Sequence, residues 1–252
     1  MLYPNVMGPF SVFLPVFGWC FLIQMMVPFR GGELARPLWV QAQGGSFMHG
    51  AGVSIAERLL DVIALSVMLI AAANLNPSLG DTFRTVAISG LGVALIVAVA
   101  VAVLAPSNVF SGMLRGYPRL AKRVRSFEEG VGILADTRRA VRAALATALI
   151  WATLCAGYWL ALVSSFHGEA IVMALSVLAA VNLAGLFWVA PGNVGMYQAA
   201  VVVVLAGFQV ESGEALSIGI LLHVVLLGAM VVFGLGCRIL LLYRPSAGKL
   251  IG

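Results

Sequence analysis

The sequence predicts an all-α, polytopic membrane protein with about seven transmembrane helices, and three observations carry that prediction. Hydrophobic residues make up 62% of the 252 residues, and the mean hydropathy is +1.04. Only 10% of the residues are charged, whereas a soluble domain carries roughly a quarter. Several apolar runs reach the roughly 20 residues that a helix needs to cross about 30 Å of hydrocarbon. We expect the whole chain, 1–252, to form a single integral membrane domain.

Seven apolar runs between charged segments are the predicted transmembrane helices. They lie at residues 10–29, 53–75, 85–105, 143–166, 170–190, 196–210 and 215–241.

The distribution of basic residues predicts the orientation. The polar stretch 106–142 holds eight Lys and Arg residues, and the positive-inside rule places such a loop in the cytoplasm. Threading seven crossings from there puts the amino terminus outside the cell membrane and the carboxyl terminus in the cytoplasm. Arg84 is then the only Lys or Arg outside. Within the loop, 115–130 is either a basic amphipathic helix on the inner leaflet or a solvated charged loop.

The segment 30–52 begins and ends on the cytoplasmic side in this topology. It opens with the charged stretch FRGGELARP and continues into GGSFMHGAG, which is too small and apolar for an ordinary solvated loop. We expect a re-entrant or interfacial hairpin here.

Two charged groups flank this hairpin, and together they balance three acids with three bases. On a helix, Glu57 and Asp61 share a face that Arg58 borders. A charge at membrane depth costs roughly 2.5 to 3.5 kcal/mol, so such residues are usually paired or line a polar cavity. One interpretation is an ion-paired staple that orients the hairpin. The other, compatible with it, adds a cavity in which an arginine binds a lipid phosphate in bidentate fashion. The six residues are Arg30, Glu33, Arg36, Glu57, Arg58 and Asp61.

A second interruption lies in NLAGLFWVAPGNVGMYQAA, where Pro191, Gly192 and Gly195 separate two apolar runs. Proline and glycine can end one helix and begin another, and the exposed N–H groups of the new helix attract anions. A tight cytoplasmic turn between two spans would show the same pattern. Both interpretations stay open.

No metal, cofactor or nucleic-acid partner is expected. Each of the three cysteines stands alone in an apolar run, and the three histidines are scattered without an HExxH pattern. No GxxxxGK[ST] sequence is present, so direct drive by ATP is not expected. The net charge of +5 reflects basic residues beside the spans, which topology and anionic lipid explain.

Three motifs in order, GELARP, ERLLD and PGNVGMYQ, resemble the lysylphosphatidylglycerol synthase transmembrane-region family, the flippase-like membrane domain of the multiple peptide resistance factor. The resemblance implies a polytopic lipid transporter. It also implies that the family's polar positions fall on Glu33, Arg36, Glu57, Arg58 and Asp61, and its Pro-Gly-x-x-Gly turn on Pro191, Gly192, Asn193 and Gly195. The chain departs from the family at Asn193, where a glycine is usual, and at Gln198, where a glutamate is usual.

The resemblance therefore implies a translocator that moves a phospholipid or an isoprenoid-linked glycolipid across the cytoplasmic membrane. The alternatives are a membrane-embedded transferase and an accessory subunit of a lipid or cell-envelope biosynthesis enzyme. No polar stretch exceeds about forty residues, so the soluble aminoacyl-transferase domain of the full synthase is not expected in this chain. We expect no catalytic residue. Family members generally carry further segments ahead of GELARP, so we expect a shortened or truncated start.

Overall fold

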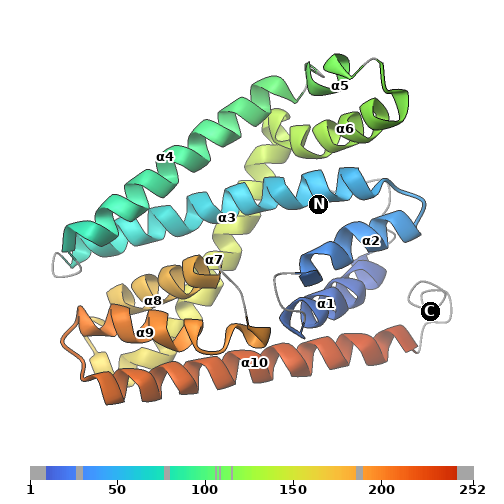
Figure 1. Cartoon of the computed structure of the whole chain (residues 1–252). Helices are drawn as coiled ribbons and strands as arrows, with labels where there is room; N and C mark the ends of the chain where they lie inside the picture. The colour runs from blue at the N-terminus through green and yellow to red at the C-terminus, as the bar shows by residue number, and fades with distance from the viewer. Residues whose placement is uncertain are drawn as a thin grey trace. The chain divides into compact units, whose positions relative to one another are not determined.

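The fold is described from a computed structural model of the chain. It describes residues 10–26, 31–76, 80–105, 107, 109–114, 116–185 and 190–242. These residues are predominantly helical and contain no β-strand, which confirms the predicted all-α class. Several long helices are visible in Figure 1, and the labels used there are kept below.

The elements follow one another in an order close to the predicted one. The α-helices are α1 (Phe10–Met26), α2 (Ala35–Ala42), α3 (Phe47–Leu75), α4 (Gly80–Leu104), α5 (Val109–Met113), α6 (Pro118–Val131), α7 (Thr137–Phe166), α8 (Ala170–Ala184), α9 (Met196–Ala206) and α10 (Ser212–Leu242). Among the described residues, three short 3₁₀ helices lie between them: η1 (Gly31–Leu34), η3 (Gly132–Ala135) and η5 (Pro191–Asn193).

Helices α3 and α7 each begin six residues before their predicted apolar runs, and a polar side chain caps each start. The Ser46 hydroxyl accepts a hydrogen bond from His49 N–H at 3.4 Å, so α3 starts at Phe47. The Asp136 carboxylate accepts from Arg139 N–H at 3.1 Å at the start of α7. Such caps satisfy N–H groups that have no partner within the helix. The apolar run marks the apolar part of a helix, and the cap marks its end.

Within the described residues, three helical segments are long and apolar enough to cross a membrane: Ala87–Leu104, Thr137–Phe166 and Ser212–Leu240. Large apolar side chains along them are exposed, as Ile96 is at 70%, which suits contact with lipid. Helix α9 has 11 residues, or about 16 Å at 1.5 Å per residue. That is roughly half of the hydrocarbon thickness. The count of seven crossings therefore stays a prediction.

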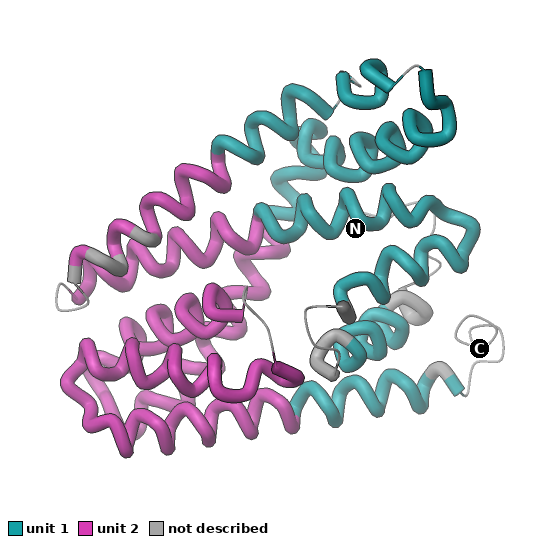
Figure 2. The backbone as a smooth tube through the Cα atoms, in the orientation of Figure 1, with its two compact units in different colours: residues 1–59, 96–144, 229–252 teal, residues 60–95, 145–228 magenta. Residues whose placement is uncertain are grey.

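The chain divides into two compact units, which Figure 2 colours separately. Unit 1 comprises residues 1–59, 96–144 and 229–252. Within unit 1, buried Val40, Val53, Ala56 and Ile133 form a small apolar cluster. A second cluster contains Val16 and Cys20 of α1. The predicted hairpin, 30–52, and the whole predicted basic loop, 106–142, belong to this unit.

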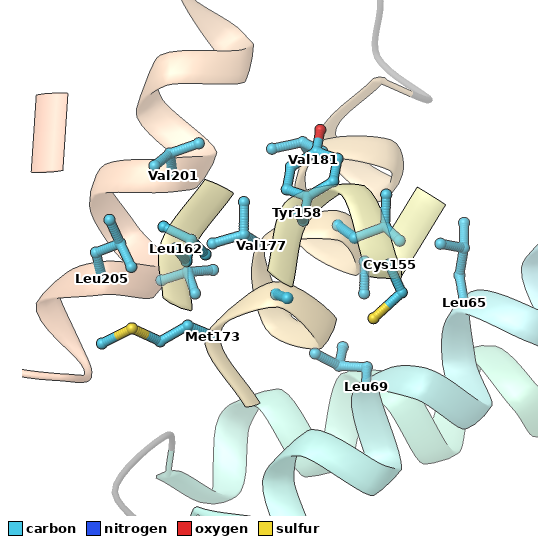
Figure 3. Packing of buried hydrophobic residues seen from close by; sticks show 14 of the residues in the cluster. Leu65, Leu69, Cys155, Tyr158, Leu162, Met173, Val177, Val181, Val201 and Leu205 are labelled. Atoms are coloured by element: carbon cyan, nitrogen blue, oxygen red, sulfur yellow. The ribbon is translucent and has the colours of Figure 1, made fainter. Parts of the chain in front are cut away.

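Unit 2 comprises residues 60–95 and 145–228. Its core is larger and is built mainly from α7, α8 and α9, with residues of α3 beside them. In Figure 3, Leu65 and Leu69 of α3 lie on one side of this core, and Val201 and Leu205 of α9 lie on the other. Met173 and Val177 of α8 are almost completely buried between them. The interrupted segment around Pro191 belongs to this unit.

Candidate functional site

The hairpin of unit 1 is a helical turn that brings the two charged groups together. Helix α2 ends in a Schellman motif, in which Gly44 N–H donates to Gln41 O at 3.0 Å and Gly45 N–H donates to Val40 O at 2.9 Å. Gly44 has φ of +81°, a conformation that glycine adopts at little cost. The chain then reverses into α3. Helix α2, this turn and the start of α3 lie within the segment 30–52, and a re-entrant or interfacial position of this segment stays a prediction.

Four of the predicted charged residues meet across this hairpin, and we call them the charged cluster: Glu33, Arg36, Glu57 and Arg58. Arg36 Nη1 is bonded to Glu57 Oε2, and Arg58 Nη2 lies 3.4 Å from Glu33 Oε1. Both pairs join the segment before the turn to the helix after it. The sequence spacing indicated contacts of Arg58 and Glu57 along one helix, and the structure adds the contacts of both residues with the segment before the turn.

The charged cluster is only partly buried. The side chains of Arg36 and Glu57 are 17% and 30% exposed, and those of Arg58 and Glu33 are 33% and 22% exposed. The Arg36 guanidinium also lies over the Phe17 ring, 5.6 Å from its centroid, a distance at which a cation is attracted to the ring face. Each guanidinium is thus oriented by neighbours and still accessible. Arg30 lies outside the described residues.

A crossing of two glycines fixes the hairpin to the basic helix α6. A Cβ atom on Gly52 would lie 2.5 Å from Phe127 O, and one on Gly130 would collide with His49 O. The backbones of α3 and α6 therefore touch directly, as small residues allow. Helix α6 confirms that the predicted basic segment is helical. In it, Val124 is partly buried.

Asp61, the sixth predicted residue, belongs to unit 2. Trp151 Nε1–H donates to Asp61 Oδ1 at 3.2 Å. The sequence argument did not identify this partner, because the two residues are 90 positions apart in the chain.

In the interruption between α8 and α9, three of the described residues have a positive φ angle, in the left-handed region. Gly192, Asn193 and Gly195 have φ of +64°, +57° and +88°. Glycine adopts this region freely, and asparagine tolerates it better than most residues do. Pro191 opens the 3₁₀ helix η5, where its missing N–H costs nothing. These conformations explain the PGNVG pattern, and they confirm that a helix ends and another begins here.

Side chains of three helices hold this interruption, and we call them the histidine network: Tyr158, Tyr197, Gln198 and His223. His223 Nε2 lies 2.9 Å from Gly192 O, and His223 Nδ1 lies 2.9 Å from Gln198 Nε2. The His223 ring stacks on Tyr197 with centroids 4.2 Å apart. The hydroxyls of Tyr197 and Tyr158 are 2.7 Å apart.

Gln198 also reaches back to the start of its own helix. Its Oε1 accepts from Gly195 N–H at 2.8 Å, the N3-to-N-cap half of a capping box. Of the network, only Gln198 was predicted. The sequence holds one signal for His223, namely a polar residue in the otherwise apolar stretch between Ser217 and Arg238 of α10. Among the described residues, no three His, Cys, Asp or Glu side chains gather in a way that could hold a metal ion.

The comparison with protein families gave one match. A family model described as "Lysylphosphatidylglycerol synthase TM region" matches residues 6–234, a range that includes both the charged cluster and the histidine network. The comparisons with curated proteins and with solved structures gave no match. The match covers most of the chain and confirms the resemblance inferred from its motifs. The chain belongs to the lysylphosphatidylglycerol synthase transmembrane-region family, and it is an integral membrane protein with a lipid-related role.

Proposed function

We propose that this protein moves a phospholipid or an isoprenoid-linked glycolipid between the leaflets of the cell membrane, and that the charged cluster binds the headgroup phosphate. Family membership supports a role with membrane lipid. The observation that carries the proposal is the pairing of Arg36 with Glu57 and of Arg58 with Glu33, in side chains that remain partly exposed.

The chemistry of guanidinium supports a phosphate ligand. Arginine presents a planar set of five N–H donors that fits two phosphate oxygens at once. Glu57 and the Phe17 ring restrict the orientation of Arg36 before a ligand arrives. Less conformational freedom is then lost on binding.

The strength of the ion pairs decides whether a phosphate can compete for the arginines. Exposed ion pairs contribute about 0 to 1 kcal/mol, whereas fully buried pairs cost about 3 to 5 kcal/mol to break. The pairs of the charged cluster are between 17% and 33% exposed, so their strength lies between these limits. An arriving phosphate can therefore replace a carboxylate at moderate cost. When the lipid leaves, the carboxylate returns and the arginine is not left unpaired.

A membrane-embedded transferase is the weaker candidate. Such an enzyme needs a carboxylate that accepts a proton or binds a metal. In the charged cluster, each carboxylate already contacts a guanidinium as an ion-pair partner. An accessory subunit would show no lipid movement as a purified protein, so the assay below also separates that alternative.

Arg36→Lys tests the proposal. Lysine keeps the positive charge that sets orientation, but it acts as a point charge and cannot form two parallel bonds to phosphate. We expect normal insertion and a loss of lipid movement of about tenfold or more. The probe is phosphatidylglycerol with a fluorescent tail group in proteoliposomes, and its outer-leaflet fraction is bleached by a membrane-impermeant reductant. An undecaprenyl phosphate probe serves as the second substrate class.

Two arginines serve as matched controls. Arg125 is exposed on α6 and pairs with Glu129, and Arg30 is one residue beyond the predicted first span. Arg125→Lys and Arg30→Lys should leave lipid movement unchanged. Full activity in Arg36→Lys would reduce the charged cluster to an orientation signal and an ion-paired staple.

We further propose that the amino terminus faces outside and the carboxyl terminus faces the cytoplasm. The basic side chains exposed on α6 and at the start of α7 support this orientation. Single cysteines are placed at Arg84 and at Arg123 in a background without the three native cysteines. An impermeant reagent added outside should label position 84 and leave position 123 unlabelled. Labelling at position 123 from outside would contradict the orientation.

A further inference from the structure

His223 lies near the middle of α10 and is 3% exposed. Both ring nitrogens are engaged, Nε2 with Gly192 O and Nδ1 with Gln198 Nε2, each at 2.9 Å. A histidine held at both nitrogens has a defined protonation state if its partners can only donate or only accept.

The partners of His223 and Gln198 assign the protons of these two side chains. A carbonyl oxygen accepts, so His223 Nε2 must carry the hydrogen that Gly192 O receives. The Gly195 backbone N–H can only donate, so the Gln198 atom facing it is the carbonyl oxygen Oε1. The Gln198 atom facing His223 is then the NH₂ group, which donates to Nδ1. His223 is therefore neutral and in the Nε2–H tautomer.

This arrangement offers no acceptor for a second proton on the ring, so binding that proton requires the contacts to rearrange. If Nδ1 of His223 takes a proton from water, the new N–H faces the Gln198 NH₂ group, and two donors oppose each other. Rotating the Gln198 amide would offer its oxygen to His223. The NH₂ group would then face Gly195 N–H, which is again donor against donor. Either way, one of the two hydrogen bonds of Gln198 is lost.

No charged side chain compensates for the added proton. Among the described residues, the groups facing His223 are the Tyr197 ring of α9, the Gln198 amide and the Gly192 carbonyl, and the Tyr158 hydroxyl of α7 follows beyond Tyr197. None of them is a carboxylate, guanidinium or ammonium group. A proton on His223 thus adds an unpaired charge to a buried site, which favours rearrangement toward water.

We propose that His223 is a proton-binding site and that protonation releases the segment Pro191–Met196 from the helices around it. The segment is held by the contacts of His223 with Gly192 and of Gln198 with Gly195. Among its other side chains, Asn193 is buried and the remainder offer little restraint. Pro191, Val194 and Met196 are exposed, and an added Cβ on Gly195 would meet nothing within 4 Å.

Coupling of this release to lipid movement rests on the proposed function. If the protein moves lipid as proposed, His223 binds a proton, and this proton uptake is the step that releases the segment between α8 and α9. The release itself does not depend on lipid movement, so it is tested without a lipid substrate.

The first measurement establishes the state of His223 in the unmodified protein. The protein is labelled with ¹⁵N-histidine and reconstituted in lipid nanodiscs, and the imidazole signals are assigned with His49→Gln and His167→Gln variants. At about pH 8, His223 should show the neutral Nε2–H tautomer. At the lowest pH at which the protein stays folded, it should bind the second proton, and a ring that remains neutral there would also overturn the inference. A charged ring or an Nδ1–H tautomer at the higher pH would overturn the inference.

The second measurement follows the segment itself by hydrogen–deuterium exchange, corrected for the chemical dependence of exchange on pH. Exchange at residues 190–198 should rise about fivefold to tenfold between the two pH values, the equivalent of one lost hydrogen bond. His223→Gln removes the titrating group and should abolish this rise. His167→Gln changes an exposed histidine of the same unit and should retain it. An equal rise in His223→Gln would refute the proposal, whether or not the protein moves lipid.

Discussion

The charged cluster and the histidine network both place polar side chains among apolar helices, but they differ in charge and in burial. The charged cluster of unit 1 uses full charges, and its side chains stay 17% to 33% exposed. The histidine network of unit 2 uses neutral groups, and His223 and Tyr197 are only 3% exposed. Both lie within chains of apolar helices, where an unsatisfied polar group is costly.

The difference follows from the cost of burial. Moving a charge out of water costs several kcal/mol even when it is paired, whereas a neutral group needs only a hydrogen-bond partner. The charged cluster therefore keeps access to polar surroundings, as a site for an anionic headgroup requires. The histidine network can be buried because its groups are neutral and the donors around His223 and Gln198 meet acceptors. It also becomes sensitive to a single added proton for the same reason.

The largest effect is expected at the contact between α3 and α6, which fixes the helix that carries Glu57 and Arg58. Gly130→Ala should destabilise the protein by about 3 kcal/mol or more, because the new Cβ would meet the backbone of His49 and the two helices would have to separate. The measurement is reversible unfolding in mixed detergent micelles, followed by circular dichroism. Gly112→Ala is the control, since a Cβ there meets nothing within 4 Å. Equal stability of the two variants would contradict the described crossing.

The second prediction compares a partly buried ion pair with an exposed one. Glu57→Gln leaves Arg36 without its bonded carboxylate and should cost about 2 kcal/mol, between the values for exposed and buried pairs. Combined with Arg36→Met, the loss should be smaller than the sum of the single losses. The Arg125–Glu129 pair, with side chains 64% and 56% exposed, should show a coupling of less than about 0.5 kcal/mol. Equal couplings would remove the energetic distinction between these sites.

The sequence predicted the helices better than it predicted the partners. Apolar runs located the long helices because lipid and core burial both require a continuous apolar surface. Proline and glycine predicted the interruption near Pro191 because few residues adopt its backbone angles. The partner of Arg36 depends on the turn at Gly44, which sets how α2 meets α3. His223 is 25 residues from Gln198, and no short motif links two helices at that separation.

The third prediction concerns the hydrogen bond from the neutral Trp151 indole to the Asp61 carboxylate. This contact combines a neutral group, as in the histidine network, with an acid, as in the charged cluster. Trp151→Phe removes the indole N–H that donates to Asp61 at 3.2 Å. Its coupling with Asp61→Leu should be about 1 kcal/mol in a double-mutant cycle. The same unfolding measurement applies. Strictly additive losses would show that the contact contributes nothing to stability.

The smallest net effect is expected for the tyrosine pair, and it distinguishes the two groups most directly. The hydroxyls of Tyr158 and Tyr197 are 2.7 Å apart and both residues are buried. Tyr158→Phe leaves the Tyr197 hydroxyl without this partner and should cost about 1 to 2 kcal/mol. Replacing both tyrosines with phenylalanine removes donor and acceptor together, and the ring that stacks on His223 is kept. The double variant should therefore be more stable than Tyr158→Phe and within about 0.5 kcal/mol of the unmodified protein. A double variant less stable than either single one would show that the two hydroxyls each have a further role in the histidine network.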